Sequence, residues 1–160
     1  MALYRTYSDY LKEKYNVKIV KICPECFAGL PIPRVPSEIR EDKVFSKDGR
    51  DITEEFLDGA EKTYEVVERK QADFAILKER SPSCGSSYIY DGSFSGKVIQ
   101  GQGFTARKLN EENIVIGEGI FQLAGIITKN DTWCGEYDFR KEVKNLDINK
   151  FNFFKKFFIS

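Results

Sequence analysis

Apolar residues along the chain fall into short blocks whose spacing alternates between a helical and an extended pattern. Residues 53–71 carry apolar side chains at helical spacing, which predicts a helix with one buried face. Residues 72–79, "ADFAILKE", have an unbroken apolar centre, which is typical of a buried parallel strand. Applied to the whole chain, these patterns predict helices over 3–15, 53–71 and 104–113, and extended segments over 17–22, 43–52, 72–79, 96–103 and 114–120.

The helix over 53–71 has the clearest signals. Thr53 is expected to cap its first turn, where acidic residues follow at once. Its buried face is expected to consist of Phe56, Leu57, Ala60, Tyr64 and Val67.

Strands and helices alternate along the chain, which predicts an α/β fold. We expect one domain over residues 1–160, with a small, mostly parallel sheet flanked by helices. In such sheets, sites form beyond the carboxyl ends of the strands. Cys23 follows one predicted strand and Cys84 lies shortly after another, so both are expected at the same edge.

Two unusual loops follow these two strands. "CPECFAGLPIPRVPSEI" (23–39) contains four prolines, which favour a rigid, irregular segment, and its Arg34 is expected to pair with Glu38 or Asp91. "KERSPSCGSSYIYDGSFSG" (78–96) is rich in serine and glycine and holds one cysteine. By composition alone this second loop would be a flexible surface turn.

Charge and composition narrow the chemistry. The 25 basic and 25 acidic side chains cancel, which gives no general attraction for nucleic acid. No apolar run approaches the roughly 18 residues that a membrane helix needs, and no signal-peptide pattern is present, so we expect a cytoplasmic protein. The chain has no histidine, and acid–base work must therefore use Asp, Glu, Lys, Tyr, Cys or a metal.

The two loops together resemble the thiouracil desulfurase family, a former domain of unknown function, over about residues 18–117, with 118–160 as a C-terminal extension. The resemblance implies a small α/β protein with a four-iron four-sulfur cluster. Three cysteines would hold that cluster and leave one iron open to the sulfur of a thiolated pyrimidine. The implied reaction removes sulfur from 2-thiouracil or a related thiolated base.

Carried over by position, the resemblance assigns cluster binding to Cys23 and Cys84. Its polar motif positions fall on Glu25, Lys78, Ser81 and Ser83, which become the candidate catalytic residues. The family's N-terminal segment with the first cysteine ligand is absent from the 22 residues before Cys23. Either this is a truncated member of the family that lacks the third ligand, or Cys26 or Cys134 supplies that ligand.

The chemistry of these residues agrees with that assignment. A vacant iron would accept a soft sulfur atom, and Glu25 is the best proton shuttle for the water that replaces it. Lys78 could orient a pyrimidine carbonyl, although a solvated lysine at a strand end is nearly as plausible. Cys23 and Cys26 have the spacing of a metal-binding or a redox pair.

Two other functions remain open at this stage. An inactive family member could serve as a binding or assembly protein, with the aromatic tail 151–160 joining copies into a homo-oligomer. Alternatively, Cys23, Cys26, Cys84 and Cys134 could form a structural zinc site. A thiolated position in tRNA is a possible but less favoured substrate, because the net charge is zero.

Overall fold

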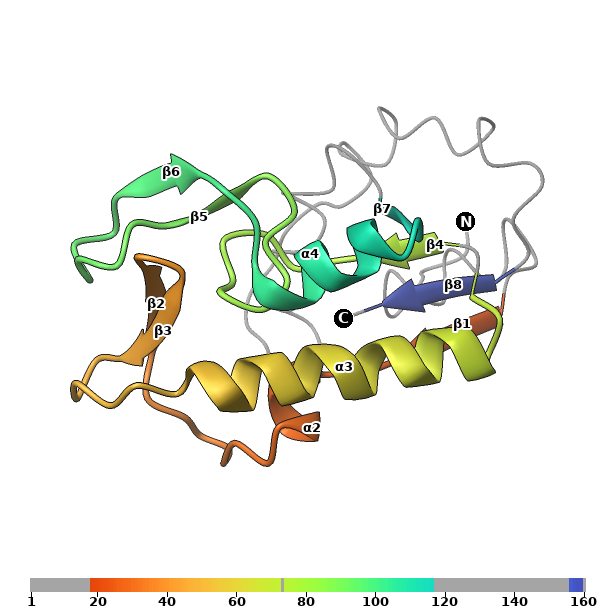
Figure 1. The fold of residues 1–160 in the computed structure, drawn as a ribbon, viewed down its shortest axis with the longest axis horizontal. Helices are drawn as coiled ribbons and strands as arrows, with labels where there is room; N and C mark the ends of the chain where they lie inside the picture. Colours follow the sequence, from red (N-terminus) through yellow and green to blue (C-terminus); the bar gives the residue numbers. More distant parts are fainter. Residues whose placement is uncertain (1–17, 73, 117–155, 160) are drawn as a thin grey trace, which may run out of the picture.

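A computed structural model describes residues 18–72, 74–116 and 156–159 of the chain (Figure 1). In chain order, the described elements are β1 (Lys18–Lys21), α2 (Pro24–Phe27), β2 (Ser37–Arg40), β3 (Lys43–Ser46), α3 (Thr53–Arg69), β4 (Phe74–Ile76), β5 (Tyr88–Tyr90), β6 (Val98–Gln100), α4 (Phe104–Glu111), β7 (Val115–Ile116) and β8 (Lys156–Ile159). The predicted helix over 3–15, the end of the extended segment 114–120 and Cys134 lie outside these residues.

The largest sheet has four parallel strands in the order β1-β8-β4-β7. β8 comes from the tail of the chain and lies between β1 and β4 (Figure 1). Ile159 is level with Lys21 on one side and with Ile76 on the other. The aromatic tail was expected to pack or self-associate, and its residues 156–159 pair within the chain's own sheet.

The remaining strands form two antiparallel pairs, β2 with β3 and β5 with β6. The α/β class is therefore confirmed. The expectation of a mostly parallel sheet is wrong for the protein as a whole, because two of the three sheets in the described residues are antiparallel. The β2–β3 turn uses Glu41 and Asp42 at φ values of 50° and 58°, the backbone of a tight hairpin. β2 was not predicted, because its first three residues fall in the proline-rich segment 23–39, which was expected to be an irregular loop.

The long helix α3 runs beneath the sheet and the loops in Figure 1. Its predicted buried face is confirmed for Phe56, Ala60 and Val67, but Leu57 is 47% exposed. Thr53 is the first helical residue rather than the cap. The N-cap is Ile52, whose side chain makes no capping hydrogen bond, and the carboxylate of Asp51 just before it accepts a hydrogen bond from the Thr53 backbone N–H at 3.1 Å.

Among the described residues, α3 connects two groups of buried apolar side chains. One includes Val67, Ala75, Leu77 and Leu109, and lies near the parallel sheet. The other includes Val44, Phe56, Ile89 and Phe104, and lies near the antiparallel pairs. Cys84 belongs to the first group. In the described part of the chain, no helix is long and apolar enough to cross a membrane.

Candidate active site

The first cysteine loop begins directly after β1. Cys23 precedes α2, and Pro24 occupies its first turn, where a missing N–H costs nothing. The Cys23 carbonyl accepts hydrogen bonds from the N–H groups of Cys26 at 3.0 Å and Phe27 at 3.1 Å. The segment therefore contains one short helical turn in spite of its four prolines, although an irregular loop was expected here.

A glycine in α3 lets this turn lie close to the long helix. A Cβ atom added at Gly59 would be 2.4 Å from the Pro24 carbonyl oxygen, well inside van der Waals contact. Gly59 is itself buried. The position of the cysteine turn thus depends on the absence of a side chain at Gly59.

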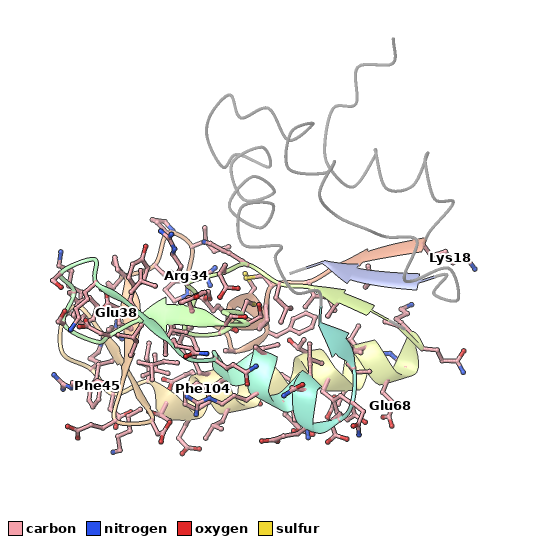
Figure 2. All side chains as sticks on the ribbon, turned by 90° about the horizontal axis from the view of Figure 1, so that it is seen from above. Lys18, Arg34, Glu38, Phe45, Glu68 and Phe104 are labelled. Atoms are coloured by element: carbon pink, nitrogen blue, oxygen red, sulfur yellow. The ribbon has the colours of Figure 1, made fainter. Side chains whose placement is uncertain are left out.

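Arg34 lies over the two sulfur atoms of this turn. Its Nη2 atom is 3.4 Å from Cys26 Sγ and 3.9 Å from Cys23 Sγ, and its Nη1 atom donates to Glu25 Oε2 at 2.7 Å. Figure 2 shows Arg34 far from Lys18, which begins β1, so this cation is beyond the carboxyl end of that strand. The expected partners Glu38 and Asp91 are wrong, because Arg34 pairs with Glu25 instead.

Burial and charge both act on this group. Arg34 and Glu25 have side chains that are 21% and 22% exposed, so their ion pair is largely shielded from water. Burial alone would lower the pKa of Arg34, but Glu25 and the two cysteines raise it above its usual value. Burial raises the pKa of the Cys23 thiol, and a side-chain hydrogen bond with Cys26 adds to this effect.

The second cysteine loop is held by serine hydroxyls. Ser81 Oγ accepts hydrogen bonds from the backbone N–H groups of Ser83 at 3.1 Å and Cys84 at 3.2 Å. Ser83 Oγ lies 2.9 Å from Thr105 Oγ1 and 3.7 Å from Cys84 Sγ. All four residues are buried, and Cys84 is only 3% exposed. Ser81 and Ser83 therefore fix the Cys84 backbone in place.

This loop is also seated on the first turn of α4. The N–H groups of Phe104 and Thr105 donate to the carbonyls of Pro82 at 3.0 Å and Ser83 at 2.9 Å. A Cβ atom added at Gly103 would be 2.4 Å from the Ser83 backbone. Each cysteine loop thus packs against a glycine beside or within a helix.

Glu25 connects the two loops. Its Oε2 atom binds Arg34, and its Oε1 atom is 3.5 Å from Ser81 Oγ, although Glu25 and Ser81 are 56 residues apart. The parallel register explains this contact. Lys21 in β1 and Ile76 in β4 are both level with Ile159 of β8, so the two strands end at the same edge. Cys23 and Lys78 each come two residues later, so both loops begin at that edge. The structure therefore brings Cys23, Glu25 and Cys26 next to the loop of Ser81, Ser83 and Cys84.

Glu79 is a buried carboxylate that the sequence analysis missed. It accepts hydrogen bonds from the N–H groups of Ser86 at 3.0 Å, Ser87 at 2.9 Å and Tyr88 at 2.5 Å, and from the Ser86 hydroxyl at 2.8 Å. Its position in the sequence is a signal for this role. Glu79 comes just before a serine- and glycine-rich loop, where many backbone N–H groups lack strand partners and need another acceptor. Glu79 organises the loop that was interpreted as flexible by composition.

Lys78 is exposed shortly after the end of β4, and Arg80 is also exposed. Arg80 adopts a φ of 62°, and its N–H donates to the Tyr88 carbonyl at 3.1 Å. Both side chains therefore reach the surface where the second cysteine loop begins. Tyr88 is 46% exposed and Tyr90 is partly buried, whereas Ile89 between them is buried, as expected for the alternating sides of a strand.

The arrangement of Cys23, Cys26 and Cys84 bears on whether these residues could hold a metal ion. Within residues 18–72, 74–116 and 156–159, no three Cys, His, Asp or Glu side chains converge closely enough to hold a metal ion. This disfavours zinc on Cys23, Cys26 and Cys84, since zinc ligands converge on one point at about 2.3 Å from the metal. The cysteines of an iron–sulfur cluster each bind a different iron and stand farther apart. Cys23, Cys26 and Cys84 are free cysteines in the described residues, and thiolates are the donor type that an iron–sulfur cluster requires.

Comparisons with known proteins identify a family that matches most of the chain. The model of the 2-thiouracil desulfurase family matches residues 3–118. An uncharacterized protein of Bacillus subtilis (strain 168), YbbK, is 44% identical over 104 residues, which cover 59% of this chain and 69% of that protein. A solved structure of the 4Fe-4S-dependent thiouracil desulfidase TudS is 35% identical with a TM-score of 0.65, and the match covers 77% of this chain and 81% of that one.

Proposed function

We propose that this chain, which belongs to the 2-thiouracil desulfurase family, removes the sulfur atom of a thiolated pyrimidine such as 2-thiouracil. The single observation that carries the proposal is the junction of the two cysteine loops through Arg34, Glu25 and Ser81. The dependence of TudS on a 4Fe-4S cluster, together with its similarity to this chain, supports the same substrate class here.

The reaction is a hydrolysis. One water molecule adds its oxygen to the carbon that carries sulfur, the carbon–sulfur bond breaks, and the products are the oxo pyrimidine and hydrogen sulfide. No electrons are gained or lost overall. The enzyme must therefore bind a soft sulfur atom and move protons from water to the departing sulfide.

Cys23 and Cys84 would hold the cluster, with Cys26 or Cys134 as the third ligand. When bound, a cluster with one open iron supplies a Lewis acid that accepts the sulfur of the substrate. Arg34 would balance negative charge on the Cys23 and Cys26 sulfurs, to which it is already close.

Glu25 is the proposed proton shuttle. Its carboxylate is partly exposed, has one oxygen on Arg34 and directs the other toward Ser81. This orientation keeps the group at the junction of the loops, where the reacting carbon would lie. Lys78 is proposed to orient a pyrimidine carbonyl from its exposed position after β4.

Ser81 and Ser83 are proposed as positioning residues. Both are buried, and their hydroxyls bind the Cys84 loop and Thr105. Loss of either hydroxyl would shift the Cys84 backbone. Neither hydroxyl is proposed to touch the substrate.

The test is sulfide release from 2-thiouracil by the full chain after anaerobic reconstitution with iron and sulfide. Glu25→Gln keeps the shape of the side chain but removes its charge, and we expect sulfide release to fall by about 100-fold or more. Glu65→Gln, the same change at an exposed site in α3, is the matched control and is expected to keep wild-type activity. Reconstituted wild-type protein that releases no sulfide would overturn the proposal.

A further inference from the structure

The sulfur atoms of Cys23 and Cys26 both lie close to the guanidinium group of Arg34. Nη2 of Arg34 is within 3.9 Å of Cys23 Sγ and within 3.4 Å of Cys26 Sγ, so both sulfurs lie on the same side of one guanidinium. The proposed hydrolysis uses Cys23 as a cluster ligand and Cys26 as one candidate for the third ligand, and neither role explains why both sulfurs lie next to the same guanidinium.

The backbone of the turn suits a covalent bond between them. The Cys23 carbonyl accepts the Cys26 N–H at 3.0 Å, which closes one helical turn and places residues three apart on the same side. Cβ atoms at this spacing are about 5–6 Å apart in a helix, and a disulfide needs about 3.5–4.5 Å. Cys23 itself is extended, with φ of −119° and ψ of 109°, so its Cβ atom is not held at the helical spacing.

Exposure separates this pair from Cys84. Cys26 is exposed and Cys23 is partly exposed, whereas Cys84 is 3% exposed in the apolar core. A small oxidant in water can therefore reach Cys26 first. Arg34 Nη2 lies 3.4 Å from the Cys26 sulfur that would attack, so this sulfur is held at the surface next to Cys23.

We propose that Cys23 and Cys26 form a reversible disulfide by exchange with a low-molecular-weight disulfide such as glutathione disulfide. Cys26 attacks one sulfur of glutathione disulfide and releases one glutathione thiolate. Cys23 then attacks Cys26 in the mixed disulfide and releases the second glutathione. The two protein thiols lose two protons and two electrons, and glutathione disulfide takes the electrons as it becomes two glutathione molecules.

The disulfide would act as a redox switch on the site. It withdraws Cys23 and Cys26 from any metal, because neither sulfur of a disulfide can act as a thiolate ligand. The inference rests on the contacts of the two sulfurs, so it can be tested in iron-free protein whether or not the chain removes sulfur from pyrimidines.

Mass spectrometry of a single peptide tests this proposal. Trypsin cleavage after Lys21 and Arg34 gives peptide 22–34, which contains both Cys23 and Cys26 and no other cysteine. Full-length protein, freed of iron with a chelator, is treated with glutathione disulfide and then alkylated with a maleimide before digestion. We expect peptide 22–34 to lose both maleimide adducts and to be lighter than its reduced form by two hydrogens.

Two variants make the result specific. Cys26→Ser should leave peptide 22–34 without an internal disulfide, and Cys134→Ser, the matched control, should form it as wild type does. Treatment with a reducing thiol should restore both adducts. Full alkylation of both cysteines in protein that circular dichroism shows to be folded, a lasting glutathione adduct on Cys26, or pairing of Cys23 with another cysteine would each overturn the proposal.

Discussion

The two halves of this molecule are assembled in different ways. The parallel sheet combines strands from distant parts of the chain, with β8 between β1 and β4. The half that carries the candidate site uses local turns, in which hydrogen bonds join neighbours such as Ser81 with Cys84 and Cys23 with Cys26.

This difference shows what local sequence patterns can indicate. The chemistry of the site is written in two short segments, whereas the sheet that aligns those segments requires a strand more than a hundred residues away from β1 along the chain. The predictions that follow test this contrast, and they run from the largest expected effect to the smallest.

Removal of residues 156–160 should have the largest effect. It deletes the strand that pairs with both β1 and β4, so the sheet would be divided and the backbone groups of two strands would lose their partners. Because domains are stable by only about 5–15 kcal/mol, we expect the shortened chain to be unfolded or aggregated at about 25 °C. Circular dichroism and size-exclusion chromatography measure this.

The same deletion distinguishes this role from self-association. If the tail only joined copies into an oligomer, the shortened chain would become a folded monomer with an unchanged thermal midpoint. That result would contradict the placement of β8 inside the sheet.

The predictability of the fold follows the same division. The apolar spacing of α3 and the apolar centre of β4 were sufficient to predict both elements, because each signal is local. Thr53 was wrong as the cap, since both Asp51 and Thr53 are capping residue types and only the structure shows which one lies before the first helical turn. The position of β8 could not be predicted, because strand order depends on pairing between distant segments.

The candidate site shows a similar limit. Cys23, Glu25, Ser81 and Cys84 could be selected from short motifs, and the edge rule for parallel strands predicted that their loops would meet. Arg34 was assigned the wrong partners, because its choice among three acidic residues depends on how the loop turns. No spacing of residues in the sequence indicated the contacts of Arg34.

Glu79→Ala should have a moderate effect, confined to the site half. The change leaves the N–H groups of Ser86, Ser87 and Tyr88 without their carboxylate acceptor. We expect a loss of about 3 kcal/mol in the free energy of unfolding, measured by urea denaturation. Glu65→Ala, at an exposed position, is the control and should change stability little.

An equal effect of Glu65→Ala and Glu79→Ala would show that the loop of residues 86–88 does not depend on its buried carboxylate. Hydrogen exchange offers a second measurement. Only Glu79→Ala should speed exchange of these loop amides while those of β1 and β4 stay protected.

The smallest effect is expected at Asp51, which lies next to β3 just before the first turn of α3. Hydrogen bonds from Thr53 and Lys43 lower the pKa of Asp51 to about 2. A lowered pKa means that its stabilisation is present above the ordinary carboxyl value and is lost as the pH falls toward about 2. Asp51→Asn should therefore lower the thermal midpoint near about pH 7 and make little difference near about pH 2. A difference that is constant over this range would contradict the assignment.

The convergence of the two cysteine loops on one iron–sulfur cluster is the central claim, and the iron bound per chain tests it most directly. After anaerobic reconstitution, wild-type protein should bind iron and sulfide in the equal amounts of a 4Fe-4S cluster, and Cys23→Ala and Cys84→Ala should each lose most of both. If folded Cys84→Ala protein binds as much iron as the wild type, the two loops do not share a cluster and the account is wrong.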